Sequence, residues 1–147
     1  RSEAGQYIEN YFEKYGNVQT YMQEIAEFAK QLGYVETLFG RRLHIPDITS
    51  TNAIRRNAAE RLSINAPMQG TAADIIKIAM SKAYQAIKNR HDIRLIMQVH
   101  DELVFEVKDE ILNEIQQQMT DIMQTAVQLD VPLVVDSGIG TNWDEAH

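Results

Sequence analysis

The chain of 147 residues has no cysteine, only three prolines and a single tryptophan. Without cysteine it forms no disulfide bonds and carries no thiolate chemistry, so a reducing cytoplasm is the compartment we expect. No apolar run approaches the ~20 residues of a membrane-spanning helix, and no signal-peptide pattern opens the chain. The sequence therefore predicts an unsecreted protein with no membrane partner.

The length and the 44% hydrophobic content are sufficient for one buried core. We expect a single structural unit over residues 1–147, with residues 1–90 mostly helical around a short hairpin and residues 91–147 forming a hairpin, a helix and a final strand. Helices packed on an antiparallel sheet make this an α+β fold.

The net charge of −7 is unevenly distributed along the chain. Residues 38–94 hold ten Lys or Arg and four Asp or Glu, whereas residues 95–147 hold one Lys and eleven acids. A local basic excess is typical of a surface that meets nucleic-acid phosphates. The acidic part is the usual composition of a solvated outer face.

Residues 98–107, QVHDELVFEV, place three polar groups between two apolar strands. Before the turn, Leu95, Met97 and Val99 alternate with Arg94, Ile96 and Gln98. After it, Leu103, Phe105 and Val107 alternate with Val104 and Glu106. This period of two predicts two strands joined by a tight turn. The turn lacks the Asn-Gly or Asp-Gly pair that favours such hairpins, so another requirement selects His100 and Asp101.

A divalent metal is one such requirement. Mg²⁺ prefers carboxylate oxygens and is often held by one or two of them together with substrate phosphates. Adjacent strand residues face opposite sides, so Asp101 is the better candidate for a direct ligand and Glu102 for a weaker one. A solvated acidic turn explains these residues alone equally well.

A second polar set recurs every four residues: Arg61, Asn65 and Gln69 would share one face of a helix. Arg binds phosphates, while Asn and Gln bond to sugars and base edges. Pro67 disfavours helix at the residue before it, which predicts a kink or a break, with a fresh helix start near Thr71. An ordinary polar helix face is the alternative.

The remaining elements follow from apolar periodicity. Helices are expected around Tyr7–Tyr15, Val18–Leu32, Ala72–Asn89 and Ile111–Ala126, with Gly33 ending the second. A short hairpin is expected over Tyr34–Leu38 and Arg41–Ile45, and a strand over Pro132–Ile139 beside the central hairpin. Three methionines, Met97, Met119 and Met123, are expected in the core.

Four strings occur in the order and spacing of one known family: ETLFGRRLHIPDI, AERLSINAPMQGTAADIIK, QVHDELVFEV and GTNWDEAH. Over nearly its whole length the chain resembles the carboxy-terminal part of a family A DNA polymerase, of the bacterial DNA polymerase I type. The resemblance implies a DNA-directed DNA polymerase of replication and repair that uses two Mg²⁺ ions, with fingers and palm segments.

The resemblance also implies roles for particular residues. Asp101 matches a catalytic metal ligand, Glu102 the neighbouring acid, and His100 a residue at the primer terminus. Arg61, Asn65 and Gln69 match residues along the primer-template duplex. Minor-groove acceptors of A·T and T·A pairs look alike, so polar side chains there check pair shape without selecting sequence. Separately, Arg41 and Arg42 are candidates for binding a template phosphate, and the alternative is that they lie on an ordinary surface turn.

Two motifs of that family do not occur in this chain. The palm string DYSQIELR carries the other metal aspartate, and the pattern RRxxKxxNFGxxYG carries the lysine that binds the incoming deoxynucleoside triphosphate. Since phosphoryl transfer depends on positioning and charge stabilisation, we expect the isolated chain to be an inactive fragment that binds DNA weakly. Uncovered apolar surface is expected to favour self-association.

Two other classes of function remain open at this stage. One is a noncatalytic nucleic-acid-binding or interaction module, and the other is a metal-dependent phosphohydrolase built on His100 and Asp101. A hydrolase needs further ligands, for which Asp74, Glu106 and Asp136 are available without distinctive spacing. No role is assigned to the remaining histidines, His44, His91 and His147.

Overall fold

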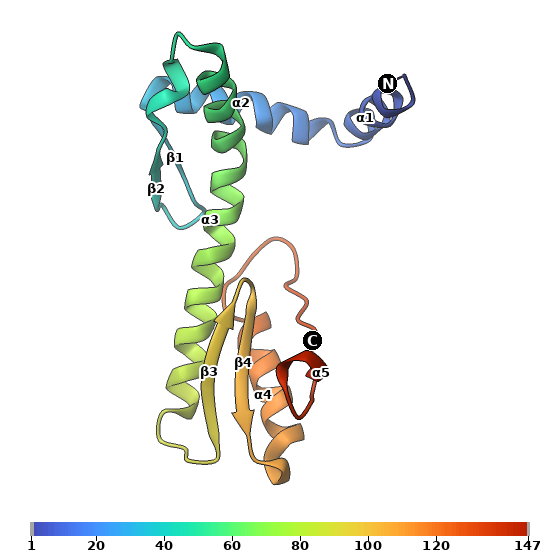
Figure 1. The fold of residues 1–147 in the computed structure, drawn as a ribbon, viewed down its shortest axis with the longest axis vertical. Coiled ribbons are helices and arrows are strands. Elements are labelled where there is room, and N and C mark those ends of the chain that lie inside the picture. The colour runs from blue at the N-terminus through green and yellow to red at the C-terminus, as the bar shows by residue number, and fades with distance from the viewer. Residues whose placement is uncertain (1, 147) are drawn as a thin grey trace. The chain divides into compact units, whose positions relative to one another are not determined.

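The computed structural model describes residues 2–146, which fall into two compact units that divide between residues 71 and 72 (Figure 1). Each unit combines helices with one small two-stranded antiparallel sheet, in agreement with the expected mixture of helix and antiparallel strands. The division falls inside helix α3 (Ala53–Ile87). His147 lies outside the described residues. Among the helices of residues 2–146, none has an apolar stretch long enough to cross a membrane.

The first unit begins with helices α1 (Ser2–Lys14) and α2 (Gly16–Leu32). As expected, α2 ends at Gly33, whose φ of 75° is left-handed and whose N–H donates to the Ala29 carbonyl at 2.8 Å. Glycine adopts this conformation without the steric cost that a Cβ brings. The chain can therefore reverse at once into strand β1 (Tyr34–Glu36).

Strand β1 pairs antiparallel with β2 (Arg42–His44), which confirms the short hairpin. A 3₁₀ turn, η1 (Pro46–Thr49), follows and leads to α3. Apolar side chains from α2, the hairpin, η1 and the start of α3 form one buried cluster: Ala29, Val35, Ile45, Ile48 and Ala59. This cluster holds the first part of α3 against the hairpin.

The prediction of a break at Pro67 and a new helix start at Thr71 is wrong. Helix α3 runs from Ala53 to Ile87 with Pro67 inside it. The proline removes one backbone donor, the partner of the Ser63 carbonyl, at a cost of about 3 kcal/mol. Ser63 and Pro67 are both buried, and the helix continues on either side of the proline. Burial of this face outweighs the local preference, because tertiary packing overrides propensity.

The second unit contains the end of α3, strands β3 (Ile93–Val99) and β4 (Glu102–Val107), the turn η2 (Asp109–Ile111), and helices α4 (Leu112–Gln124) and α5 (Trp143–Ala146). The two strands form the expected hairpin, with Val99 opposite Glu102. One face of the hairpin packs against α3 and α4 through a second buried cluster: Ala83, Ile87, Ile93, Ile115 and Met119.

A bulge in β3 changes which side chains reach this core. Leu95 lies opposite Phe105 but Met97 lies opposite Val104, so one extra residue, Ile96, stands in β3. A bulge of this kind shifts the alternation of side chains by one. Met97 is consequently 39% exposed, and its predicted place in the core is wrong, whereas Met119 is buried as expected.

The predicted strand over Pro132–Ile139 is also wrong. Residues 126–142 form neither helix nor strand, and Val134 is 78% exposed. Alternating apolar residues define two faces, but a strand also needs a free sheet edge with which to exchange backbone hydrogen bonds. The segment is attached by side chains instead: Gln116 Nε2 donates to Ser137 Oγ at 3.0 Å.

An ion-pair cluster in the second unit predicts that the free energy of unfolding depends on pH. Arg90 donates to Asp92 twice, at 2.8 and 2.9 Å, and once to Glu114 at 3.3 Å. The hydrogen bonds from Arg90 lower the pKa of Asp92 from 3.8 to about 2. Because the folded-state pKa is depressed, the stabilisation is complete above pH 3.8 and is lost as the pH falls through about 2. Urea unfolding between pH 2 and 5 should thus show a steeper loss for the native chain than for Arg90→Gln. Equal slopes would contradict the assignment.

Candidate metal and nucleic-acid site

The β3–β4 turn consists of His100 and Asp101 alone. His100 has a φ of 48°, which among the described residues makes it the single non-glycine residue with positive φ. Histidine is one of the few side chains found in this region with some frequency. The Gln98 side chain stabilises the turn by donating from Nε2 to the His100 carbonyl at 2.6 Å. Side-chain support thus replaces the glycine that usually occupies such a position.

This left-handed residue gives a direct stability test. Replacing His100 by glycine or by alanine removes the same imidazole, but only alanine keeps the cost of a Cβ at positive φ. We expect His100→Gly to exceed His100→Ala by about 1 kcal/mol in free energy of unfolding. Urea denaturation of both variants measures this difference, and equal stabilities would show that the turn relaxes.

The two acids differ in their surroundings. Asp101 is exposed at the turn, and within residues 2–146 its carboxylate has no hydrogen-bond or ion-pair partner. Glu102 is half-buried and accepts a hydrogen bond from Trp143 Nε1 at 3.4 Å. Leu103, which follows it in β4, packs toward the core, so Glu102 projects from the opposite face of the hairpin. Asp101 is available to a ligand and Glu102 is held by a neighbour.

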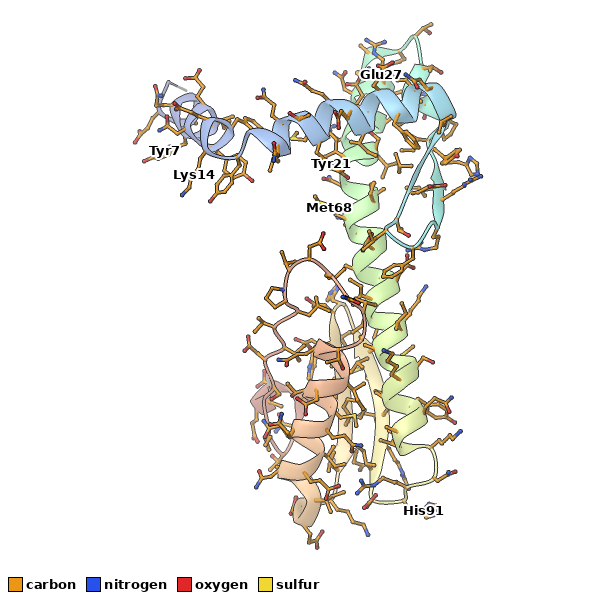
Figure 2. The ribbon with its side chains drawn as sticks, turned by 180° about the vertical axis from the view of Figure 1, so that it is seen from behind. Tyr7, Lys14, Tyr21, Glu27, Met68 and His91 are labelled. Atoms are coloured by element: carbon orange, nitrogen blue, oxygen red, sulfur yellow. The ribbon has the colours of Figure 1, made fainter. Side chains whose placement is uncertain are left out.

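The polar stripe lies on α3, within the first unit. Arg61, Asn65 and Gln69 are all exposed and, at intervals of four residues, share one side of the helix. The helical placement that the stripe required is therefore present. Met68, 63% exposed, projects from the same stretch of α3 (Figure 2).

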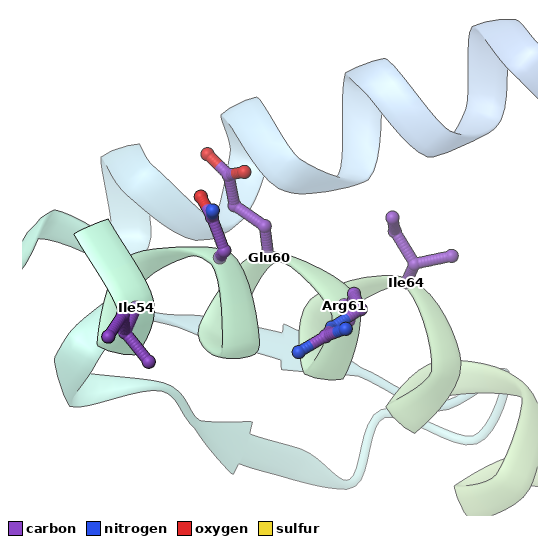
Figure 3. Close-up of a pocket in the computed structure, with 5 residues that line it drawn as sticks. Ile54, Glu60, Arg61 and Ile64 are labelled. Atoms are coloured by element: carbon purple, nitrogen blue, oxygen red, sulfur yellow. The ribbon is translucent and has the colours of Figure 1, made fainter.

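An open depression surrounds Arg61, lined by Ile54, Asn57, Glu60 and Ile64 (Figure 3). Glu60 points toward α2, where its Oε1 lies 3.1 Å from Lys30 Nζ. This ion pair neutralises the acid beside Arg61, and Arg61 itself has no polar partner within residues 2–146. The guanidinium is left to solvent or to an external anion.

Arg41 and Arg42 are less available than the sequence indicates. Arg41 Nη2 donates to the Gly70 carbonyl at 2.8 Å. Arg42 Nε donates to Glu36 Oε1 at 2.7 Å, and its guanidinium lies 4.5 Å from the Tyr34 ring centroid. The hydrogen bond to Glu36 raises the pKa of Arg42. Arg41 thus links the turn of the β1–β2 hairpin to α3, and Arg42 bonds within the hairpin.

Sequence reasoning overlooked two residues that the structure brings to these sites. Asn57 lies one helical turn before Arg61 in the depression, and the interval of four that identified the stripe would have found it. Trp143 contacts Glu102 across 41 residues of sequence, and the signals that could have identified it are that it is the sole tryptophan and that it lies in the string GTNWDEAH. His91 lies in the loop before β3, at the far end of the hairpin from His100 (Figure 2).

The donor set for a metal is partial. Asp101 and Glu102 supply hard oxygen ligands of the kind that Mg²⁺ prefers. In the part of the chain that the structure describes, no three His, Asp or Glu side chains converge to hold an ion. The hairpin therefore fits a metal that draws its other ligands from elsewhere, including substrate phosphates.

A protein family and several curated proteins match this chain along almost its whole length. Residues 1–145 match the sequence profile of DNA polymerase family A. DNA polymerase I of Pseudomonas aeruginosa is 51% identical over 148 residues, which cover the whole chain and 16% of that protein. DNA polymerase I of Bacillus caldotenax is 46% identical over 99% of the chain and 17% of its own length. The chain thus spans about a sixth of these relatives.

A solved structure shows the same fold. The polymerase domain of Pol1 from M. smegmatis, in complex with DNA primer-template and dNTP, superposes with a TM-score of 0.93 at 44% identity. The match covers 99% of this chain and 26% of that one. A profile match over nearly all residues, close relatives and a shared fold lead to one conclusion: the chain belongs to DNA polymerase family A.

Proposed function

We propose that this chain is the carboxy-terminal part of a DNA-directed DNA polymerase that acts in replication and repair. The observation that carries the proposal is the exposed Asp101 carboxylate at the tip of a rigid hairpin, in a chain that shares its fold with a polymerase domain solved on primer-template DNA. Primer-template DNA and deoxynucleoside triphosphates are the proposed substrates.

In this proposal the second unit is the palm segment and contributes to the metal site. Asp101 is a direct Mg²⁺ ligand and Glu102 an adjacent acid near the primer end, which His100 contacts. Bound Mg²⁺ ions neutralise charge on the phosphates and stabilise the attacking and leaving oxygens. The chain's own part is to hold the carboxylate at a fixed place on a short turn, at little conformational cost.

The first unit supplies the contact with duplex DNA. Arg61 is suited to a phosphate, because it is exposed and its acidic neighbour is already paired with Lys30. Asn65 and Gln69 offer donors and acceptors to the minor groove. Arg41 and Arg42 are secondary candidates, since a phosphate would have to compete with Gly70 and Glu36.

A chimera tests the proposal. The matching 148 residues of the Pseudomonas aeruginosa polymerase are replaced by this chain, and primer extension is measured with Mg²⁺ and four deoxynucleoside triphosphates. We expect the chimera to copy template and the chain alone to give no extension, because one metal aspartate and the nucleotide-binding lysine are missing from it.

Two results would overturn the proposal. A chimera that is folded and binds primer-template but cannot extend it would remove the polymerase assignment and favour a binding module. Release of product by the chain alone, without primer or template, would favour a phosphohydrolase. The lack of a third converging ligand among residues 2–146 weighs against that second outcome.

The role of Arg61 makes a separate prediction for the isolated chain. Each phosphate contact contributes about 0.9 to the slope of log affinity against log salt. Arg61→Ala should weaken duplex binding several-fold at low salt and reduce that slope by about 1. Lys88→Ala removes the same charge from an exposed site of the second unit and serves as the control. Equal slopes for both variants would remove Arg61 from the interface.

Self-association is proposed as a property of the isolated chain. Large apolar side chains are widely exposed, among them Tyr7 at 69%, Ile54 at 81% and Val134 at 78%. Where exposed apolar side chains gather into a patch, the surface commonly packs against another polypeptide. Sedimentation at increasing concentration tests this, and a monodisperse monomer at high concentration would contradict it.

A further inference from the structure

The irregular segment that ends the chain reaches the candidate catalytic turn through one side chain. Residues 126–142 have no regular structure, yet Trp143, the first residue of α5, donates its indole Nε1–H to Glu102 Oε2 at 3.4 Å. In Figure 1, α5 lies to the side of β4, next to α4. From there the Trp143 side chain reaches Glu102, the first residue of β4.

Local hydrogen bonds define the turn that carries Trp143. Glu145 Oε2 accepts from Thr141 Oγ1 at 2.7 Å and from Thr141 N–H at 3.0 Å. Asn142 Oδ1 accepts from Glu145 N–H at 3.1 Å. The bonds from Thr141 lower the pKa of Glu145, so its carboxylate is a charged acceptor at neutral pH. These hydrogen bonds join residues on either side of Trp143 and so restrain the backbone that carries it.

Two glycines allow the loop to close. A Cβ at Gly140 would lie 2.6 Å from the Cβ of Glu145, and a Cβ at Gly138 would meet the Ala146 carbonyl. The backbone at these positions approaches α5 more closely than any side chain would permit. The close approach brings the loop back toward the hairpin, where the tryptophan meets Glu102.

We propose that Trp143 is a positioning residue for Glu102: its indole N–H holds the Glu102 carboxylate beside Asp101. Only the expected effect of this contact on catalysis rests on the proposed function. The contact itself is a property of the second unit.

The chemistry of the pair supports a positioning role. The indole nitrogen can only donate a hydrogen bond, so it pairs well with a carboxylate, which can only accept one. A hydrogen bond to an ionised acceptor is stronger than one between neutral groups. Holding the Glu102 side chain in one conformation reduces the conformational entropy that is lost when a substrate or ion binds.

The single tryptophan makes the contact measurable in the isolated chain. Its indole N–H gives one resonance in a proton–nitrogen correlation spectrum. We expect Glu102→Gln to move this resonance upfield, because the charged acceptor is lost, and Asp101→Asn to leave it in place. The two variants remove equal charge from neighbouring residues, and the backbone amide spectrum of each reports whether the fold is kept.

The close approach of Gly140 to α5 offers a variant that changes neither Trp143 nor Glu102. Gly140→Ala should displace α5 and shift the indole resonance as Glu102→Gln does. Gly5→Ala, at a position with nothing within 4 Å of the added Cβ, is the matched control. An indole resonance that responds to neither Glu102→Gln nor Gly140→Ala would overturn the proposal, whatever the activity of the chimera.

A double-mutant cycle in the chimera tests the catalytic consequence. Trp143→Phe keeps an aromatic ring but removes the donor, and residues that orient ligating side chains typically affect activity by about ten-fold. We expect roughly that loss of kcat with Glu102 present and little further loss in a Glu102→Gln background. Equal losses in both backgrounds would make Trp143 structural. A chimera that is inactive in every form contradicts the proposed function. In that case the shifts of the indole resonance in the isolated chain still test the contact between Trp143 and Glu102.

Discussion

Asp101→Ala is expected to lower primer extension by the chimera at least about 10³-fold, equivalent to ~4 kcal/mol of transition-state stabilisation. The carboxylate is exposed and, within residues 2–146, unpaired. Its removal therefore costs the fold little, and the loss would report on catalysis. Single-turnover extension at saturating substrate measures the effect, and melting temperature checks the fold.

Asp109→Ala is the control for Asp101→Ala. Asp109 is also exposed and acidic, and it lies at the other end of β4, after Val107. It should retain extension within about two-fold, as surface substitutions normally do. Equal activity of the Asp101→Ala chimera and the unsubstituted chimera would make the hairpin structural and the metal assignment wrong.

Ile115→Ala is expected to destabilise the second unit by about 2–5 kcal/mol, a large fraction of the 5–15 kcal/mol typical of a domain. Ile115 is 3% exposed and belongs to the cluster in which α3, α4 and the hairpin pack together. Truncation leaves a cavity that small movements of three separate elements do not close. Urea unfolding, with amide hydrogen exchange to locate the loss, measures the effect.

Ile54→Ala is the matched control for this truncation. Ile54 is 81% exposed at the start of α3, so the same change removes almost no buried surface. Its effect should stay within about 0.5 kcal/mol. Comparable destabilisation by both variants would mean that the second cluster is not a cooperative core.

Sequence periodicity located the elements that carry the candidate sites. The alternation around residues 98–107 correctly predicts two strands joined by a tight turn, and the interval of four correctly predicts that Arg61, Asn65 and Gln69 share a helix face. Both predictions depend on local geometry, which repeats every two or 3.6 residues. Gly33 was identifiable for the same reason, since its role is set by its own backbone conformation.

Predictions that depended on distant partners failed. Pro67 indicates a helix end locally, but it is buried in the first unit and the helix continues. Residues 132–139 alternate like a strand and form none, because the spacing of side chains does not reveal whether a sheet edge is available. The bulge that exposes Met97 depends on how two strands align, and neither strand shows it alone.

The sequence by itself determined the family of this protein, the place of Asp101 on a hairpin turn and the polar stripe of α3. All three can be read from short sequence strings or from the spacing of nearby residues, so they do not depend on distant contacts. Only the tertiary structure decided which charged groups remain available: Glu36 occupies Arg42, Lys30 neutralises Glu60, and Trp143 reaches Glu102. Availability depends on contacts between residues far apart in the chain, and those contacts form when apolar clusters bring the elements together.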